Sequence, residues 1–307
     1  MEQNKPSCIV LGANGYIGRH LCFYLDQMGW DVKAYGKNDS RHPSLPLTIP
    51  YSQLDITDEK NVQSIDWIAD FIFHFSGITG TKVSFDQYDE FTRVNELGLL
   101  NVLNALKDLK SKPRVIFPSS RLVYKGSTSA LREEDEKEAK TIYAANKLNC
   151  ERFLETYNSQ FYIPYTVFRI CVPYGNLLDE SFSYGTIGFF LNRAISGKTI
   201  VLYGDGQLKR TFTPIESLCC QIEEAVKNEI SINEKYNIGG ETMSLANAAR
   251  IIAKKYNVEI EYAPWPKEDL KIESGDTVFN DMKISKIITV KSSSSLKEWI
   301  STISLEN

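Results

Sequence analysis

Apolar and polar residues follow two alternating spacings in the first half of the chain. Short apolar runs indicate buried strands at residues 8–12, 31–35, 70–76, 114–120 and 165–170. Between several of these runs, apolar residues recur every three or four positions, which predicts helices at residues 15–28, 91–109 and 139–157. Strands that alternate with helices in this way are typical of an α/β fold with a doubly wound parallel sheet.

The regular alternation of strands and helices changes after about residue 173. Helical spacing recurs at residues 186–195, 215–227, 245–256 and 296–303, and short strands are predicted at 199–203, 235–239 and 258–262. We therefore predict two parts. Residues 1–172 form the main sheet, and residues 173–307 form mainly a smaller α/β substrate lobe, from which some strands can return to the main sheet.

Composition narrows the class of protein further. The 307 residues are 42% hydrophobic and 24% charged, with a net charge of −4 and no basic block, which argues against a nucleic-acid partner. The N-terminus has no signal-peptide core, and no run approaches the roughly 18 apolar residues of a membrane span. Six scattered cysteines and three dispersed histidines predict neither a disulfide framework nor a metal site. We expect a soluble, cytoplasmic protein.

The segment GANGYIG, residues 12–18, follows the first predicted strand and opens the first helix. A glycine-rich turn in this position is typical of dinucleotide binding, whereas a plain tight turn is the alternative. Gly12 allows the turn, Gly15 lets a pyrophosphate approach the helix N-terminus, and Gly18 lets helix and strand pack closely. We therefore predict a Rossmann-like sheet. The other cofactor contacts expected in this loop are Asn14, Tyr16 and Ile17.

The end of the second predicted strand bears on the choice of cofactor. An acidic residue there would bind the ribose 2′-hydroxyl of NAD, but Lys37 occupies the position and Arg41 follows. A basic end suits a 2′-phosphate, so NADP(H) is favoured, and NAD(H) stays open because Asp39 could turn inward. Further along, Asp55 is expected near the adenine amino group, with Ile56 beside it.

Tyr143 and Lys147 lie four residues apart in a predicted helix and would point the same way. A phenol is a poor acid–base group at neutral pH, but a neighbouring ammonium favours its ionised form, so we expect a lowered Tyr143 pKa. Such a tyrosine can move a proton while hydride moves at the adjacent carbon. Ser119 and Ser120, at the carboxyl end of the fourth strand, could hold the substrate oxygen. Taken alone, Tyr143 is best interpreted as an ordinary half-buried helix residue. The glycine loop and the strand-end serines, in the expected chain order, favour a catalytic role instead.

Nearly the whole chain resembles the nucleotide-sugar epimerase/dehydratase family of extended short-chain dehydrogenases/reductases. The segments that carry the resemblance are GANGYIG, HFSG, RVNELGLLNVLNAL, SSRLVYKG, YAANKLNCERFL, FRICVPYG, the stretch from GTIGFF to IESL, and YNIGGETMSLANAARIIA. The resemblance implies Ser120, Tyr143 and Lys147 as catalytic residues. It implies further cofactor contacts at Phe75, Ser76, Gly77 and Asn95, and substrate contacts at Thr79, Ser120, Arg121, Val172, Arg210 and Asp276, with Arg210 meeting the substrate phosphate.

Several positions depart from the family pattern. The 4,6-dehydratases of the family carry an Asp-Glu pair where this chain has Arg121 and Leu122, so dehydration is not expected. Val172 aligns with an asparagine that touches the sugar nucleotide in many members. Glu273 stands where many UDP-sugar epimerases have an arginine, three residues before Asp276, which puts a UDP-type contact in doubt.

Three functions follow from the resemblance. The first is NADPH-dependent reduction of a 4-keto sugar carried by a nucleoside diphosphate. The alternative is a nucleotide-sugar 4-epimerase that retains NAD, and a minor alternative is a non-catalytic protein that senses dinucleotides. In the family, homodimers commonly form through a four-helix contact, here expected from the helices at 91–109 and 139–157. The loops at residues 80–88 and 177–184 are expected to select the sugar.

Overall fold

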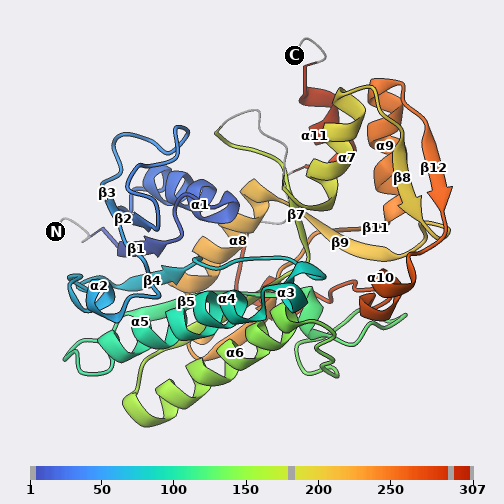
Figure 1. Cartoon of the computed structure of the whole chain (residues 1–307). Helices are drawn as coiled ribbons and strands as arrows, with labels where there is room; N and C mark the ends of the chain where they lie inside the picture. The colour runs from blue at the N-terminus through green and yellow to red at the C-terminus, as the bar shows by residue number, and fades with distance from the viewer. Residues whose placement is uncertain (1–4, 179–183, 290–293, 305–307) are drawn as a thin grey trace.

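The computed structural model describes residues 5–178, 184–289 and 294–304 (Figure 1). Its centre is a seven-stranded sheet in which every neighbouring pair of strands is parallel. From edge to edge the strands are β10 (Glu234–Asn237), β6 (Tyr165–Ile170), β5 (Arg114–Ser120), β4 (Phe71–His74), β1 (Ser7–Leu11), β2 (Asp31–Gly36) and β3 (Tyr51–Gln53). This sheet confirms the predicted doubly wound fold. The sequence YSQ of β3 carries no apolar run, so its pattern did not reveal the strand.

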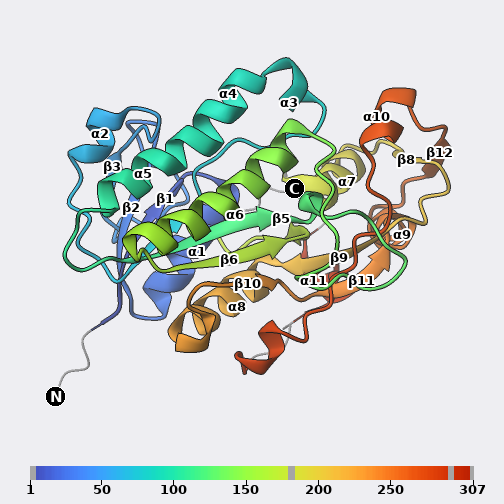
Figure 2. The same ribbon diagram turned by 90° about the horizontal axis from the view of Figure 1, so that it is seen from below.

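Helices cover both faces of this sheet (Figures 1 and 2). Along β1, Cys8 and Val10 pack in the same core as α1 (Tyr16–Gln27) and α8 (Ile215–Lys227). Ile9 and Leu11 point to the opposite face and pack in a second core. The helices of that face are α2 (Glu59–Gln63), α5 (Gly98–Leu106) and α6 (Ile142–Phe161). Successive side chains of one strand thus fill two separate cores, which is why the strands read as continuous apolar runs.

The single helix predicted at residues 91–109 is interrupted in the structure. After α3 (Val83–Asp86), the chain forms α4 (Tyr88–Thr92), a π-helical turn η1 (Arg93–Leu97) and then α5. The wider turn contains the buried Asn95, whose side chain binds both backbone groups of Ile78. A π-turn is a local insertion that hydrophobic spacing does not register.

The helix predicted at 139–157 begins instead at Ile142, because the Thr141 hydroxyl accepts a hydrogen bond from the Ala144 N–H and caps it. It continues to Phe161, and Tyr162 ends it in the left-handed conformation. This helix carries the Tyr143 and Lys147 side chains toward the carboxyl edge of the sheet.

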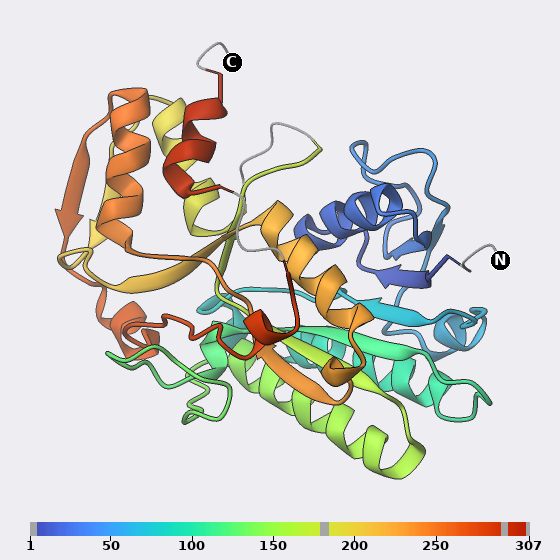
Figure 3. The ribbon, with the colours of Figure 1, turned by 180° about the vertical axis from the view of Figure 1, so that it is seen from behind.

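The smaller lobe packs around its own core of buried apolar residues (Figures 1 and 3). One sheet has the order β11 (Glu241–Ser244), β9 (Lys209–Pro214), β7 (Val172–Tyr174), and the other pairs β12 (Ile260–Ala263) with β8 (Ile200–Tyr203). Its helices are α7 (Gly185–Ile195), α9 (Leu245–Tyr256), α10 (Lys267–Ile272) and α11 (Leu296–Thr302). Short helical turns elsewhere are η2 (Arg121–Val123), η3 (Glu229–Ser231) and η4 (Ile284–Lys286).

Between these lobe elements, the chain crosses back to the main sheet to form α8 and β10. The boundary at residues 172 and 173 stays a prediction. In the residues that the structure describes, no helix has the length and apolar character needed to cross a membrane. All six cysteines are free thiols.

Candidate active site

A cavity lies where the first turn of α1 meets the carboxyl ends of β4 and β5. It joins the glycine loop to the predicted catalytic residues. The residues that line it are Gly15, Tyr16, Ile17, Gly18, Phe75, Ser76, Gly77, Ile78, Thr79, Pro118, Ser119, Ser120, Tyr143, Lys147, Ile170, Cys171, Pro173 and Tyr184. Ligands bind at this edge of open parallel sheets, because the loops that follow the strands diverge there.

The glycine loop is closely packed against the loop that follows β4. Gly12 has φ +81°, and a Cβ atom there would lie 2.6 Å from backbone atoms of Phe75 and Ser76. A Cβ on Gly18 would lie 2.2 Å from the Gly12 carbonyl oxygen. Both positions therefore require glycine. Gly12 needs it for its positive φ and for its close approach to the loop after β4, and Gly18 needs it for the close packing of α1 on the end of β1.

Ser120, Tyr143 and Lys147 come together at the cavity wall. Ser120 lies near Tyr143 and partly opposes the rise in its pKa, and the Ser120 hydroxyl oxygen accepts a hydrogen bond from the Leu122 N–H at 3.2 Å. Lys147 Nζ donates to the Pro118 carbonyl oxygen at 2.7 Å and lies 5.8 Å from the centre of the Tyr143 ring. The neighbouring Ser119 donates to Glu151. The choice of Ser120 as the catalytic serine, which the family resemblance implies, stays a prediction.

The predicted lowering of the Tyr143 pKa is wrong for this structure. Burial raises the pKa of Tyr143 well above its usual value, and Tyr184 adds to the rise. Ser120 and the charge of Arg121 only partly oppose it. Burial also lowers the pKa of Lys147 to about 8. The sequence places the two side chains on one face but does not reveal that both are almost fully enclosed, and desolvation dominates.

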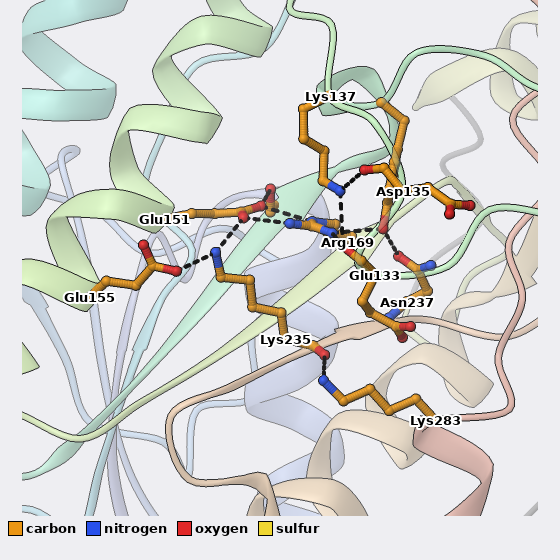
Figure 4. A network of polar contacts seen from close by, with 11 residues as sticks. Glu133, Asp135, Lys137, Glu151, Glu155, Arg169, Lys235, Asn237 and Lys283 are labelled. Carbon is orange, nitrogen blue, oxygen red and sulfur yellow. Dashed lines mark hydrogen bonds and ion pairs between the residues drawn. The ribbon is translucent and has the colours of Figure 1, made fainter.

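Behind the cavity, Glu151 follows Lys147 by four residues on the same face of α6 and anchors a buried polar network (Figure 4). It accepts hydrogen bonds from Ser119 at 2.6 Å and from Arg169 Nε and Nη2 at 3.0 and 2.7 Å. Lys235 joins Glu151 to Glu155 by ion pairs of 3.1 and 2.7 Å. Glu151 is not among the site residues predicted from the sequence, although its spacing of four and eight residues from Lys147 and Tyr143 indicates the same helix face.

Other predicted cofactor contacts lie around the cavity rather than in its wall. The Asn14 amide holds the loop after β2, because it donates to the Ser40 carbonyl and the Tyr51 hydroxyl and accepts from the His42 N–H. Gly12 supports the turn as described above, and the buried Ile56 packs beneath α5 against Gly98.

The charged residues predicted to select the cofactor have partners within the protein. Lys37, with 64% of its side chain exposed, forms a 3.7 Å ion pair with Asp55. Asp55 Oδ1 also accepts from the Thr57 N–H and hydroxyl. Arg41 Nη1 donates to the Pro46 carbonyl at 2.8 Å.

Asn95 acts on the cavity through the loop that follows β4. Its Oδ1 accepts from the Ile78 N–H at 2.9 Å and its Nδ2 donates to the Ile78 carbonyl at 3.1 Å. The Cys150 thiol donates to the Asn95 carbonyl. Asn95 therefore positions Ile78 and its neighbours in the cavity wall.

The predicted substrate contacts divide into two groups. Thr79 and Ser120 line the cavity, whereas Val172 is buried in the core of the smaller lobe. Arg210 is buried, and its guanidinium donates to Glu273 Oε1 and to the carbonyl oxygens of Lys209 and Gly275. Asp276 Oδ1 accepts from the Lys209 N–H at 2.8 Å and holds β9.

Tyr184 is a cavity residue that the sequence did not single out. Its ring stacks on that of Tyr16, with centroids 4.3 Å apart and an angle of 12°. Tyr16 in turn donates its hydroxyl to the Gly175 carbonyl at 2.7 Å. These contacts join the glycine loop to the smaller lobe across more than 150 residues of sequence. Local sequence patterns cannot predict contacts between segments so far apart. The adjoining residues 179–183, within the loop expected to select the sugar, lie outside the described part of the chain.

The glycine loop fits the pyrophosphate of a dinucleotide. Gly15 is the N-cap residue of α1 and has no side chain, so the first N–H groups of the helix are not capped by it. The first turn carries no acidic residue, and Gly15 to Gly18 line the cavity. Uncapped N–H groups at the positive end of a helix bind anionic phosphate groups well.

This arrangement defines a short-chain dehydrogenase/reductase of the extended type. The model of the NAD dependent epimerase/dehydratase family matches residues 8–239, and the chain belongs to that family. It is 30% identical to a UDP-N-acetyl-alpha-D-glucosaminuronate decarboxylase of Bacillus cytotoxicus over 251 residues, or 77% of this chain and 76% of the relative.

Two solved structures have the same fold. A UDP-glucose 4-epimerase of Thermotoga maritima with UDP-glucose superimposes with a TM-score of 0.84 at 21% identity, over 96% of each chain. A UDP-glucuronic acid 4-epimerase of Bacillus cereus, in complex with UDP-glucuronic acid and NAD, gives a TM-score of 0.81 at 21% identity, also over 96% of each chain.

Proposed function

We propose that this protein is a nucleotide-sugar 4-epimerase that retains NAD. The observation that carries the proposal is that Ser120, Tyr143 and Lys147 line the same cavity as the glycine loop. When bound there, the dinucleotide supplies the hydride acceptor and donor for an alcohol carbon. The solved UDP-sugar 4-epimerases of the same fold support this choice.

The three side chains have separate tasks. Tyr143 accepts the proton of the sugar C4 hydroxyl and later returns it, and Ser120 holds the same oxygen by a hydrogen bond. Because burial makes the Tyr143 phenolate costly, a positive charge beside it is required. Lys147, with a pKa of about 8, is mostly cationic at neutral pH and lies beside the ring.

A second candidate is a 4-ketoreductase that uses NADP(H). Lys37 and Arg41 follow β2 where a 2′-phosphate would lie, and the Lys37 ion pair at 3.7 Å is long and exposed. Two contacts argue against the reductase. Lys37 is already paired with Asp55, and the Arg41 guanidinium donates a hydrogen bond to the Pro46 carbonyl. A dinucleotide sensor without catalysis receives the least support, because Ser120, Tyr143 and Lys147 all line the cavity.

One experiment separates these candidates. The purified protein is denatured and any released dinucleotide is identified by mass, and the intact protein is then incubated with UDP-hexoses and UDP-hexuronates and the products are read by NMR. Bound NAD with inversion at C4 supports the epimerase. An empty protein that binds NADPH more tightly than NADH favours the reductase. Loss of the carboxyl carbon from a hexuronate would replace both candidates with a decarboxylase, the activity for which the Bacillus cytotoxicus relative is named.

The proposal includes a cytoplasmic homodimer built through α5 and α6. Support comes from exposed apolar side chains on α6 and on α4 and η1, which precede α5, with exposed fractions of 63% at Tyr88, 44% at Leu97 and 38% at Phe161. Light scattering should give twice the chain mass for the protein and one chain mass for Leu97→Glu. A monomeric wild-type protein would contradict the dimer.

A further inference from the structure

Arg121 is a cation next to the cavity wall: it follows Ser120, which lines the cavity, but is not itself one of the lining residues. It is half-buried. Its Nη1 donates to the Thr277 hydroxyl at 3.3 Å, and within residues 5–178, 184–289 and 294–304 it forms no other hydrogen bond and no ion pair. A guanidinium has five N–H donors, so most of its hydrogen-bonding capacity remains unused.

The neighbouring Arg210, in contrast, has an ion-pair partner and several hydrogen-bond acceptors. It donates to Glu273 Oε1 at 2.7 Å and to the carbonyl oxygens of Gly275 and Lys209 at 2.7 and 2.8 Å. Glu273 Oε1 also accepts from the Gly275 N–H at 3.0 Å. Glu273 is therefore paired with Arg210. Its charge also raises the pKa of Arg121, but it forms no ion pair with Arg121 in the described part of the chain.

The charge of Arg121 acts on two residues of the cavity wall. It opposes the rise in the pKa values of Tyr143 and Cys171. Burial, followed by repulsion from Arg210, lowers the pKa of Arg121 to about 10, so the guanidinium remains cationic at neutral pH. A half-buried cation that is repelled by its neighbour and forms no ion pair among the described residues is a candidate for ligand binding rather than a source of stability.

We propose that Arg121 binds a carboxylate on the sugar, so that the preferred substrates are nucleoside-diphosphate hexuronates rather than neutral hexoses. The inference rests on the proposed nucleotide-sugar function. The planar guanidinium matches a carboxylate through two parallel hydrogen bonds, which makes arginine the side chain best suited to this group.

The position of Arg121 favours the sugar over the diphosphate as the source of the anion. Its backbone continues from Ser120, which lines the cavity together with Tyr143. In a hexuronate the carboxyl carbon, C6, is bonded to C5, which is the ring carbon next to the reacting C4. A carboxylate in that position lies close to the oxygen on C4 that Tyr143 binds, and the charge of Arg121 is near enough to Tyr143 to oppose the rise in its pKa.

The test uses pairs of ligands that differ at the carboxyl carbon alone: UDP-glucuronate with UDP-glucose, and GDP-mannuronate with GDP-mannose. Dissociation constants are measured by calorimetry in the cofactor-loaded Tyr143→Phe protein, in which conversion is blocked, and again after adding Arg121→Gln or Arg121→Lys. We expect the uronate of at least one pair to bind roughly 10- to 100-fold more tightly than its hexose, the range for a hydrogen-bonded charge pair.

The ratio within a pair isolates the carboxylate. Arg121→Gln should abolish the preference while leaving hexose binding within about threefold, and Arg121→Lys should retain part of it. Equal losses for uronate and hexose would overturn the inference and assign Arg121 to the diphosphate. An unchanged preference would also overturn it. Failure of all four ligands to bind would overturn the nucleotide-sugar function and this inference with it, whereas binding without turnover in the Tyr143-containing protein would count against the epimerase alone.

Discussion

Arg169 and Glu151 form a buried, bidentate ion pair one helical turn beyond Lys147 (Figure 4). Only 2% of the Arg169 side chain and 1% of the Glu151 side chain are exposed. Burial alone would raise the pKa of Glu151, but the hydrogen bonds and charge of Arg169, with Lys235 and Ser119, outweigh it and lower that pKa. The pair fixes β6 against α6, and Ser119 connects it to the strand end that carries Ser120.

Replacing Glu151 should therefore destabilise the fold strongly. Glu151→Gln removes the negative charge and leaves Arg169 buried without a counter-ion, which costs about 3–5 kcal/mol of unfolding free energy for pairs of this kind. Denaturant titration measures the change. The matched control is Glu155→Gln on the same helix, whose carboxylate is 47% exposed and binds Lys235, and for which less than about 1 kcal/mol is expected. Equal losses in the two variants would contradict a special role for the buried pair.

Buried His74 should make the protein sensitive to mild acid. The ring is fully enclosed near Phe117, and neither ring nitrogen has a hydrogen-bond partner among the described residues. Burial, with the nearby charge of Lys147, lowers the pKa of His74 from 6.5 to about 3. The unfolded chain binds this proton first as pH falls. The stability contributed by neutral His74 is therefore complete above pH 6.5 and is lost between pH 6.5 and 3, by at most about 1.4 kcal/mol per pH unit.

The variant His74→Leu cannot take up that proton. Between pH 6.5 and 5 its melting temperature should fall less steeply than that of the wild type, whatever its absolute stability. Glu151, whose pKa lies below 4.5, does not contribute to the slope in this window. Parallel curves for the two proteins would show that His74 has nearly the same pKa in the folded and unfolded states, against the expectation.

The sequence predicts those parts of the site that depend on local pattern. The glycine loop, the serines at the end of β5 and the Tyr143–Lys147 pair each follow from a strand end or a helical spacing, and the structure brings them to one cavity. The choice of Ser120 over Ser119 came from the family resemblance. The sequence fails where distant segments decide the outcome. Asn14 is held by residues of the loop after β2, and Arg210 is engaged by Glu273 some 60 residues further on. The pKa of Tyr143 depends on enclosure by several segments, which no spacing within α6 reports.

Tyr143→Phe tests the proton-transfer step. The substitution removes the hydroxyl and keeps the ring, so cofactor binding and folding should stay nearly unchanged while turnover falls by roughly 10²- to 10⁴-fold. Tyr157→Phe is the control, because Tyr157 lies on the same helix and binds Asn104 at the surface. Near-normal turnover in Tyr143→Phe would remove Tyr143 from the mechanism.

Gly12 and Gly29 provide a matched pair for testing the glycine loop. Both have φ +81°, but a Cβ atom on Gly29 has no neighbour within 4 Å, whereas one on Gly12 meets the backbone of Phe75 and Ser76 at 2.6 Å. Alanine at Gly29 should cost about 1–2 kcal/mol for the left-handed conformation alone. Alanine at Gly12 should cost more and should also displace Phe75 and Ser76, which line the cavity, so dinucleotide affinity should fall at least tenfold. Denaturation and dinucleotide titration of both variants measure the two effects separately. If Gly12→Ala bound the dinucleotide as tightly as Gly29→Ala, the contact between the glycine loop and the β4 loop would not be needed to shape the cofactor site.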